Sequence, residues 1–103
     1  IQRFNALFEY ETQWSVNGWS SQSVVNKPSI AIDSERGLLY AVDPENYRVL
    51  AWDLEGQFRA TWGLYGNDQQ SFTLPTGVAV GADGNVYVAD GDSHRILVFP
   101  PLE

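Results

Sequence analysis

One stretch of this chain occurs twice. The segment NVYVADGDSHRILVF at residues 85–99 follows the pattern of LLYAVDPENYRVLAW at residues 38–52. The identical residues of the longer alignment form these pairs: Pro28/Pro75, Ala31/Ala79, Gly37/Gly84, Tyr40/Tyr87, Asp43/Asp90, Arg48/Arg95 and Leu50/Leu97. Arg36 is an extra residue in the first copy and Gly77 in the second. A spacing of about 47 residues predicts a fold that is built from repeated units.

A third, partial copy lies at the start of the chain. Residues 1–14 align with residues 49–62, and the matched pairs are Phe4/Trp52, Tyr10/Phe58, Thr12/Ala60 and Trp14/Trp62. The chain therefore begins partway through one repeat, completes a second and stops partway through a third.

Each repeat predicts four short strands, which we call a, b, c and d. In the second copy strand a is VAV, b is VYVAD and c is RILVF, while the first copy adds QFRATW as d. These runs are rich in β-branched and aromatic residues, and turn signals such as ADGN bound them. We expect strands c and d of a partial unit at residues 1–14, a complete unit at 28–62, and a unit that lacks its outer strand at 75–100.

Both faces of the expected strands are apolar, so each sheet must be sandwiched between other sheets. Repeated four-stranded antiparallel sheets of this kind predict an all-β fold of β-propeller blades, with about two blades in this chain. Two blades cannot close a ring. We therefore expect copies to assemble, with the N-terminal strand d of one copy completing the last blade of its neighbour. Three copies give a six-bladed homotrimer and four give an eight-bladed tetramer. The alternative is a segment of a larger single-chain propeller.

The segment LPTGVAVGADGNVYVADGDSHRILVF at residues 74–99 resembles the NHL repeat, whose pattern is roughly P-x-G-V-A-V-x-x-x-G-N-V-Y-V-A-D-x-x-N-x-R-I-x-V-F. The first copy departs from the pattern, because it lacks the glycine after Pro-x and has Leu38 where asparagine is usual. The resemblance implies a six-bladed propeller. It also extends to bacterial NHL segments that lie outside the membrane on larger proteins, an analogy that leaves the compartment open.

Composition argues against several classes of partner. Thirteen acidic and six basic residues give a net charge of −7, which opposes nucleic-acid binding and an anionic membrane surface. The RNA-binding function of some NHL propellers therefore does not carry over. The apolar runs are too short for a spanning helix. The chain has neither cysteine nor methionine, and no signal peptide is visible, so we interpret it as a processed or excised piece of a longer protein.

Antiparallel geometry places the d–a loops and the b–c turns at one end of the blades. We call this end the loop face, and binding residues commonly lie on such loops. The candidate ligand-binding residues are Trp19, Tyr65, Asp68, Glu45, Tyr47, Asp92 and His94. Their acidic and aromatic character suits a basic peptide or a sugar. Trp19 lies in an insert and has no repeat equivalent, which makes it the first residue to test for sugar binding.

The pairs Asp43 with Arg48 and Asp90 with Arg95 recur across the b–c turns. An active site is not normally repeated in every blade, so we interpret these pairs as structural. His94 is the single histidine, whereas NHL-type amidating lyases use several histidines near the propeller axis. The segment DGD at residues 90–92 is not part of a complete calcium-binding loop, because the rest of the twelve-residue pattern with its terminal glutamate is absent from the sequence. We expect no catalytic residue, no metal and no cofactor.

The function that this sequence favours is a non-catalytic NHL propeller module, a self-assembling scaffold for protein or ligand binding. A propeller that binds carbohydrate or peptidoglycan is the alternative. An enzyme of the lyase or hydrolase type is the least favoured.

Overall fold

The computed structural model describes residues 1–16, 19, 28–66 and 71–102. Within these ranges every regular element longer than three residues is a β-strand, and all strand pairs within the sheets are antiparallel. The expected all-β architecture is therefore confirmed. No helix in the described ranges has the length and apolar character to cross a membrane.

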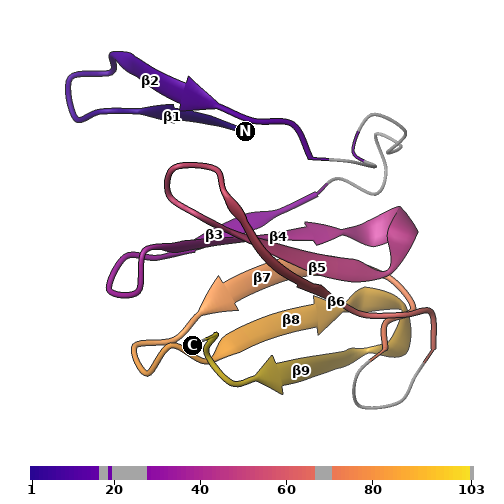
Figure 1. Ribbon diagram of the computed structural model, residues 1–103. Coiled ribbons are helices and arrows are strands. Elements are labelled where there is room, and N and C mark those ends of the chain that lie inside the picture. The colour runs from indigo at the N-terminus through magenta and orange to yellow at the C-terminus, as the bar shows by residue number, and fades with distance from the viewer. Residues whose placement is uncertain (17–18, 20–27, 67–70, 103) are drawn as a thin grey trace.

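Three sheets follow one another along the chain (Figure 1). The N-terminal hairpin consists of β1 (Gln2–Phe4) and β2 (Tyr10–Gln13). The first blade consists of β3 (Ile30–Asp33), β4 (Leu38–Asp43), β5 (Arg48–Asp53) and β6 (Phe58–Trp62). The second blade consists of β7 (Pro75–Val80), β8 (Val86–Asp90) and β9 (Arg95–Phe99). Neighbours in sequence are neighbours in each sheet, so each sheet is a simple meander.

The N-terminal hairpin has the register of strands c and d. In the first blade Ala51 pairs with Ala60, and an irregularity then shifts the register. In the hairpin Arg3 pairs with Thr12, and the register shifts at the equivalent place. A β-bulge adds a residue to one strand and bends it, so its recurrence indicates that both strand pairs share one local structure. The hairpin therefore has the strand pairing of the outer half of the first blade.

The two extra residues of the alignment lie where the backbone absorbs them. The register of β7 and β8 shifts between Pro75 and Gly77, so the added residue is accommodated at Thr76, while Gly77 pairs with Ala89. Arg36 lies in the turn between β3 and β4, where its backbone N–H donates to Asp33 Oδ1 at 3.1 Å. The insertions therefore leave the pairing of the blades intact.

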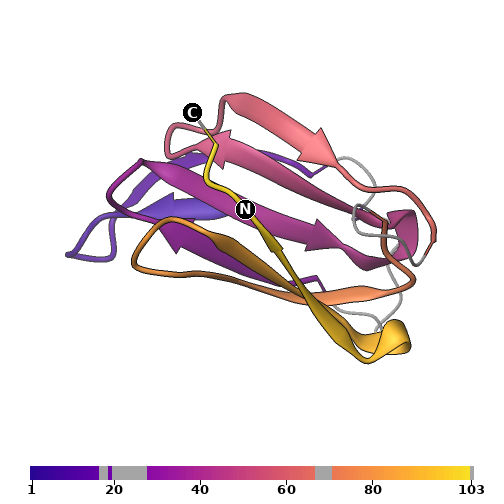
Figure 2. The same cartoon turned by 90° about the horizontal axis from the view of Figure 1, so that it is seen from below.

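Successive sheets stack through apolar faces, with the first blade between the N-terminal hairpin and the second blade (Figure 1). Figure 2 views the same stack from below, from the side of the second blade. Side chains of β4 alternate between the two neighbours: Tyr40 and Val42 belong to the cluster shared with the second blade, and Leu39 and Ala41 to the cluster shared with the hairpin. All six residues of β4 are buried, as expected for a strand that is covered on both faces.

A tryptophan from each strand d covers the seam to the following blade. The Trp62 ring lies 5.4 Å from that of Phe99, and the Trp14 ring lies 6.3 Å from that of Trp52, measured between ring centroids. Phe99 and Trp52 occupy equivalent positions in their strands c. The same aromatic contact therefore joins the hairpin to the first blade and the first blade to the second.

The outer face of the second blade has no neighbouring sheet in the described part of the chain. Tyr87, Ile96 and Val98 are 37%, 68% and 53% exposed, whereas the equivalent Tyr40 and Val49 in the first blade are fully buried. The expectation that both faces of every strand are buried thus holds for β4 and β5 of the first blade. It does not hold for the outer strands β3 and β6 of that blade, nor for the second blade. We call this surface the open face.

We expect Trp62→Ala to lower the free energy of unfolding by about 3 kcal/mol, because it removes the ring that bridges the two blades. Trp62→Phe should cost much less, since the indole N–H has no hydrogen-bond partner among the described residues. Urea unfolding followed by circular dichroism measures both values. Equal losses for the two variants would contradict a packing role for the ring.

Candidate functional site

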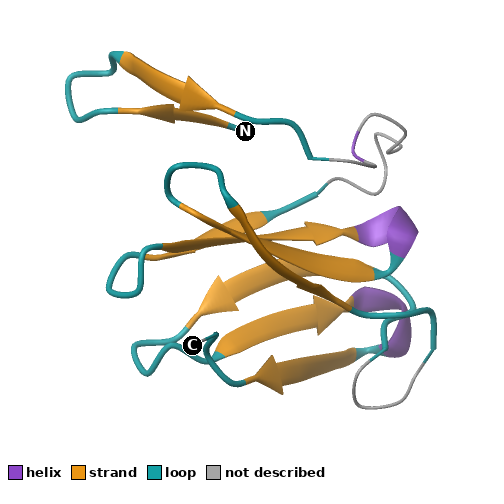
Figure 3. Ribbon diagram, viewed as in Figure 1, coloured by secondary structure: helices purple, strands orange, loops and turns teal. Residues whose placement is uncertain are grey.

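The b–c turns of the two blades share one backbone form. Strand b ends at a buried aspartate, and a single 3-10 turn follows: η2 (Pro44–Asn46) in the first blade and η3 (Gly91–Ser93) in the second. The next residues, Tyr47 and His94, have left-handed φ angles of 57° and 54°. The order of elements at this end is the same in both blades, and Figure 3 shows the two short turns at one end of the sheets. The d–a connection and the b–c turns do lie together at the loop face (Figure 1).

Each turn is held by its Asp–Arg pair. Arg48 Nε lies 2.9 Å from Asp43 Oδ2, and Asn46 Nδ2 donates to both oxygens of this carboxylate at 3.1 Å. In the second blade Arg95 Nη2 lies 3.3 Å from Asp90 Oδ2. Both carboxylates are fully buried, and a buried charge needs such charge-assisted hydrogen bonds.

Asp90 also fixes the d–a loop. Its carboxylate accepts hydrogen bonds from the backbone N–H of Leu74 at 2.7 Å and from the backbone N–H and hydroxyl of Thr73 at 3.1 and 3.0 Å. Arg95 Nη2 donates in addition to the carbonyl of Ser71 at 2.8 Å. Sequence reasoning found the Asp–Arg pair and missed Thr73 and Ser71, because the equivalent loop of the first repeat has a different length and sequence.

The surroundings of Asp90 lower the pKa of its carboxyl group below the usual 3.8. Burial alone would raise this pKa, but the backbone N–H groups of Leu74 and Thr73, the Thr73 hydroxyl and Arg95 stabilise the ionised form and outweigh burial. The ionised carboxylate is therefore the form that the fold requires.

Tyr47 and Tyr65 form the one aromatic pair of candidate residues that the described structure brings together. Their ring centroids are 4.8 Å apart in an edge-to-face arrangement, and Tyr65 is 69% exposed. The loop is anchored by buried Phe72, whose backbone N–H donates to the Leu64 carbonyl at 2.8 Å. Tyr65 and the neighbouring Leu64 are thus exposed to solvent beside a buried anchor.

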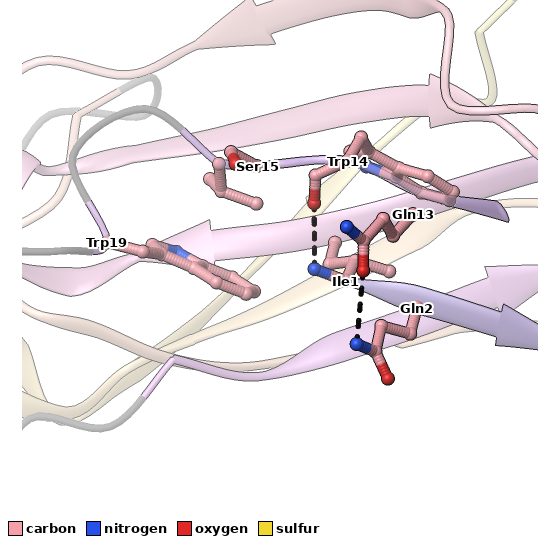
Figure 4. Close-up of a pocket in the computed structure, with 7 residues that line it drawn as sticks. Ile1, Gln2, Gln13, Trp14, Ser15 and Trp19 are labelled. Atoms are coloured by element: carbon pink, nitrogen blue, oxygen red, sulfur yellow. Dashed lines mark hydrogen bonds between the residues drawn. The ribbon is translucent and has the colours of Figure 1, made fainter.

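Trp19 lies on the opposite side of the first blade. It packs against the cluster shared with the hairpin, and its indole N–H donates to the Val42 carbonyl at 3.2 Å. Figure 4 shows it at the edge of an open cavity of about 560 Å³, with Trp14 and Ile1 on the other side. Tyr47 packs against the cluster shared with the second blade, so the structure does not place Trp19 and Tyr47 in one site.

The remaining candidates are turn residues. Asp92 and His94 are exposed in the turn of the second blade, and Glu45 is half-buried in that of the first. Asp68 lies outside the described residues. In the described part of the chain no three His, Asp or Glu side chains gather closely enough to hold a metal ion.

The stability of the second blade should depend on pH through Asp90. The folded-state pKa is the lower one, so the contribution of the ionised carboxylate is complete above pH 3.8 and is lost as the pH falls through the folded-state value. We expect Asp90→Asn to cost about 2 kcal/mol at pH 7 and to flatten this acid-side loss. Urea unfolding between pH 2 and pH 7 tests this, with Asp43→Asn as the matched variant. An unchanged acid dependence in Asp90→Asn would contradict the assignment.

Comparison with known proteins agrees with this architecture. The NHL repeat pattern matches residues 72–99, which cover the second blade and the end of its d–a loop. The chain is also 33% identical to the B-box type zinc finger protein ncl-1 of Caenorhabditis elegans over 106 aligned positions, which include 93% of this chain. It spans only 12% of the length of that protein. The chain therefore carries an NHL repeat in the second of its antiparallel blades, as its sequence predicts.

Proposed function

We propose that this chain is a non-catalytic sector of an NHL propeller that serves as a scaffold for protein contact. NHL repeats generally act as protein-interaction scaffolds. The proposal rests on the open face. This surface repeats the one by which the first blade holds the second, so it is built to receive another blade.

The b–c turns support a structural role for their charged residues. Asp43 and Asp90 are buried and engage Arg48 and Arg95 in the same way in both blades. Groups that are needed to hold every turn are poorly placed to act on a substrate. We therefore assign these four residues to the framework of the propeller.

We propose that further copies of the chain cover the open face. Contacts between successive blades are heterologous, because each blade uses one face toward its predecessor and the other toward its successor. Repetition of such a contact closes a ring when the rotation per blade permits it. Three copies with two blades each would form a six-bladed ring, and four copies an eight-bladed one.

Ile96→Glu should prevent this assembly, since it places a charge in the centre of the open face. Leu64→Glu is the matched control, because it introduces the same charge at a loop position that is 75% exposed. Native mass spectrometry should show closed oligomers for the natural chain and Leu64→Glu, and monomers for Ile96→Glu. A well-folded natural chain that stays monomeric at high concentration would contradict the proposal.

We further propose that the loop face binds basic peptide segments through Tyr47 and Tyr65. The chain carries a net charge of −7, and an exposed tyrosine offers contact area at little entropic cost. The carbohydrate alternative uses the same exposed ring. Trp19 gives this alternative little support, because its indole N–H already donates a hydrogen bond to the Val42 carbonyl.

Tyr65→Ala should weaken binding of a basic peptide by roughly tenfold or more, as loss of a tyrosine anchor usually does. A basic peptide library and a glycan array, each probed with the natural chain and Tyr65→Ala, measure the effect. Glycan binding that is lost in Tyr65→Ala would favour the carbohydrate alternative. Unaltered binding of either ligand by Tyr65→Ala would contradict a role for this ring.

A further inference from the structure

The turn between β1 and β2 has the same backbone structure as the turn between β5 and β6. The Asn5 backbone N–H donates to the Glu9 carbonyl at 3.0 Å, and Asn5 Oδ1 accepts hydrogen bonds from the backbone N–H groups of Leu7 and Glu9 at 2.9 and 3.0 Å. Asp53 makes the same three bonds in the first blade, each 2.9 Å long. Such side-chain bonds to the backbone fix a tight turn. The two turns can therefore be compared position by position.

Two positions of this turn are apolar in the hairpin and not in the first blade. Leu7 stands in the place of Glu55, and Phe8 stands in the place of Gly56. The side chains of Leu7 and Phe8 are 77% and 87% exposed. Phe8 also has a left-handed φ of 63°, a conformation that suits Gly56 and destabilises a bulky residue. The hairpin thus holds an aromatic side chain in solvent at a place where glycine is the more stable residue.

This exposure does not depend on whether another sheet lies in front of the hairpin. The hairpin itself lies in front of the equivalent turn, yet the Glu55 side chain there is 72% exposed. Gly56 is covered by the ring of Trp14, and a Cβ at this glycine would come within 2.6 Å of that ring. A phenylalanine in the place of Gly56 excludes such a cover. A sheet packed in the same way in front of the hairpin would therefore leave Leu7 exposed and would have no room for a tryptophan at Phe8.

The charged side chains beside this turn are mainly acidic. Glu9 is exposed within the turn, and its carboxylate accepts a hydrogen bond from Asn5 Nδ2 at 3.0 Å. Arg3 is the only basic side chain of the hairpin, and it is paired with Glu11 at 3.1 Å and with Glu55 at 2.8 Å. A protein surface that complements this turn in charge therefore carries arginine or lysine.

We propose that Leu7 and Phe8 form a docking knob for a partner protein with an apolar pocket that basic side chains surround. The hydrogen-bonded turn holds both side chains in place before binding, which lowers the entropic cost of docking. A few large side chains seated in a pocket commonly supply most of the affinity of a protein interface. Figure 1 shows the β1–β2 turn at the opposite end of the sheets from the b–c turns, so the knob is separate from the loop face. It requires no assembly of copies.

Two phage-displayed libraries of one three-helix scaffold serve as the probes. Both vary the apolar residues of a shallow pocket, which is bordered by arginine and lysine in the first library and by aspartate and glutamate in the second. Selection on the natural chain should enrich the first library. Leu7→Ser and Phe8→Gly should each raise the Kd of the selected binders by about tenfold or more. Leu64→Ser, which alters a leucine of similar exposure on the loop face, should leave the Kd unchanged.

A second measurement separates binding from folding. Phe8→Gly removes a side chain from a left-handed position, so it should slow hydrogen exchange of the Leu7 and Glu9 amides about fivefold. The reverse change, Gly56→Phe, should speed exchange in the equivalent turn, because φ there is 90° and Trp14 leaves no room. Loss of binding in Phe8→Gly together with slower exchange assigns Phe8 to recognition. Faster exchange in Phe8→Gly would show that the ring holds the turn, and it would overturn the proposal.

The remaining outcomes also decide the proposal. Binders that come from the acidic library, or that hold Leu7→Ser and Phe8→Gly as tightly as the natural chain, overturn it. Phosphatidylcholine vesicles that sediment the natural chain but not Leu7→Ser would make the knob a lipid contact instead. Oligomers that Leu7→Ser abolishes would make it a contact between copies. The assembly proposed through the open face is tested separately, because Ile96→Glu leaves Leu7 and Phe8 unaltered.

Discussion

The apolar contact between successive sheets is the interaction on which the whole structure depends. The sheet of the first blade is not amphipathic in the usual sense, because β4 and β5 carry large apolar side chains on both faces. Such a sheet is stable only between two others. Blade stacking therefore decides the fold, and the turns, the bulges and the Asp–Arg pairs serve to keep each sheet in the correct register for its neighbours.

The repeat made most of this architecture predictable. Paired residues such as Tyr40 and Tyr87, or Asp43 and Asp90, can occupy equivalent places only if their segments fold alike. Strand order and the ends at which loops gather then follow from antiparallel pairing. The structure adds information that strand pairing does not give. Equivalent side chains differ in burial, depending on whether another blade packs against them. Tyr40 is covered and Tyr87 is not.

Residues without a repeat equivalent were the hardest to place from the sequence. Trp19 was expected on the binding surface because it lies in an insert, yet its ring fills a gap beside the first blade and its N–H meets the Val42 carbonyl. The hydrogen bonds of Thr73 with Asp90 depend on the path of a long loop, which no local pattern fixes. The proximity of Tyr47 and Tyr65 likewise depends on Phe72, whose buried position draws the loop against the blade.

The aromatic contact that crosses each seam has a consequence for symmetry. Trp14 meets Trp52 and Trp62 meets Phe99, so the first blade receives a tryptophan from the hairpin and gives one to the second blade. The face that gives a tryptophan differs from the face that receives one. A two-fold axis would place two identical faces against each other, so this contact is not self-complementary. The sheets of this chain therefore follow one another in one direction, each contact joining a different pair of faces.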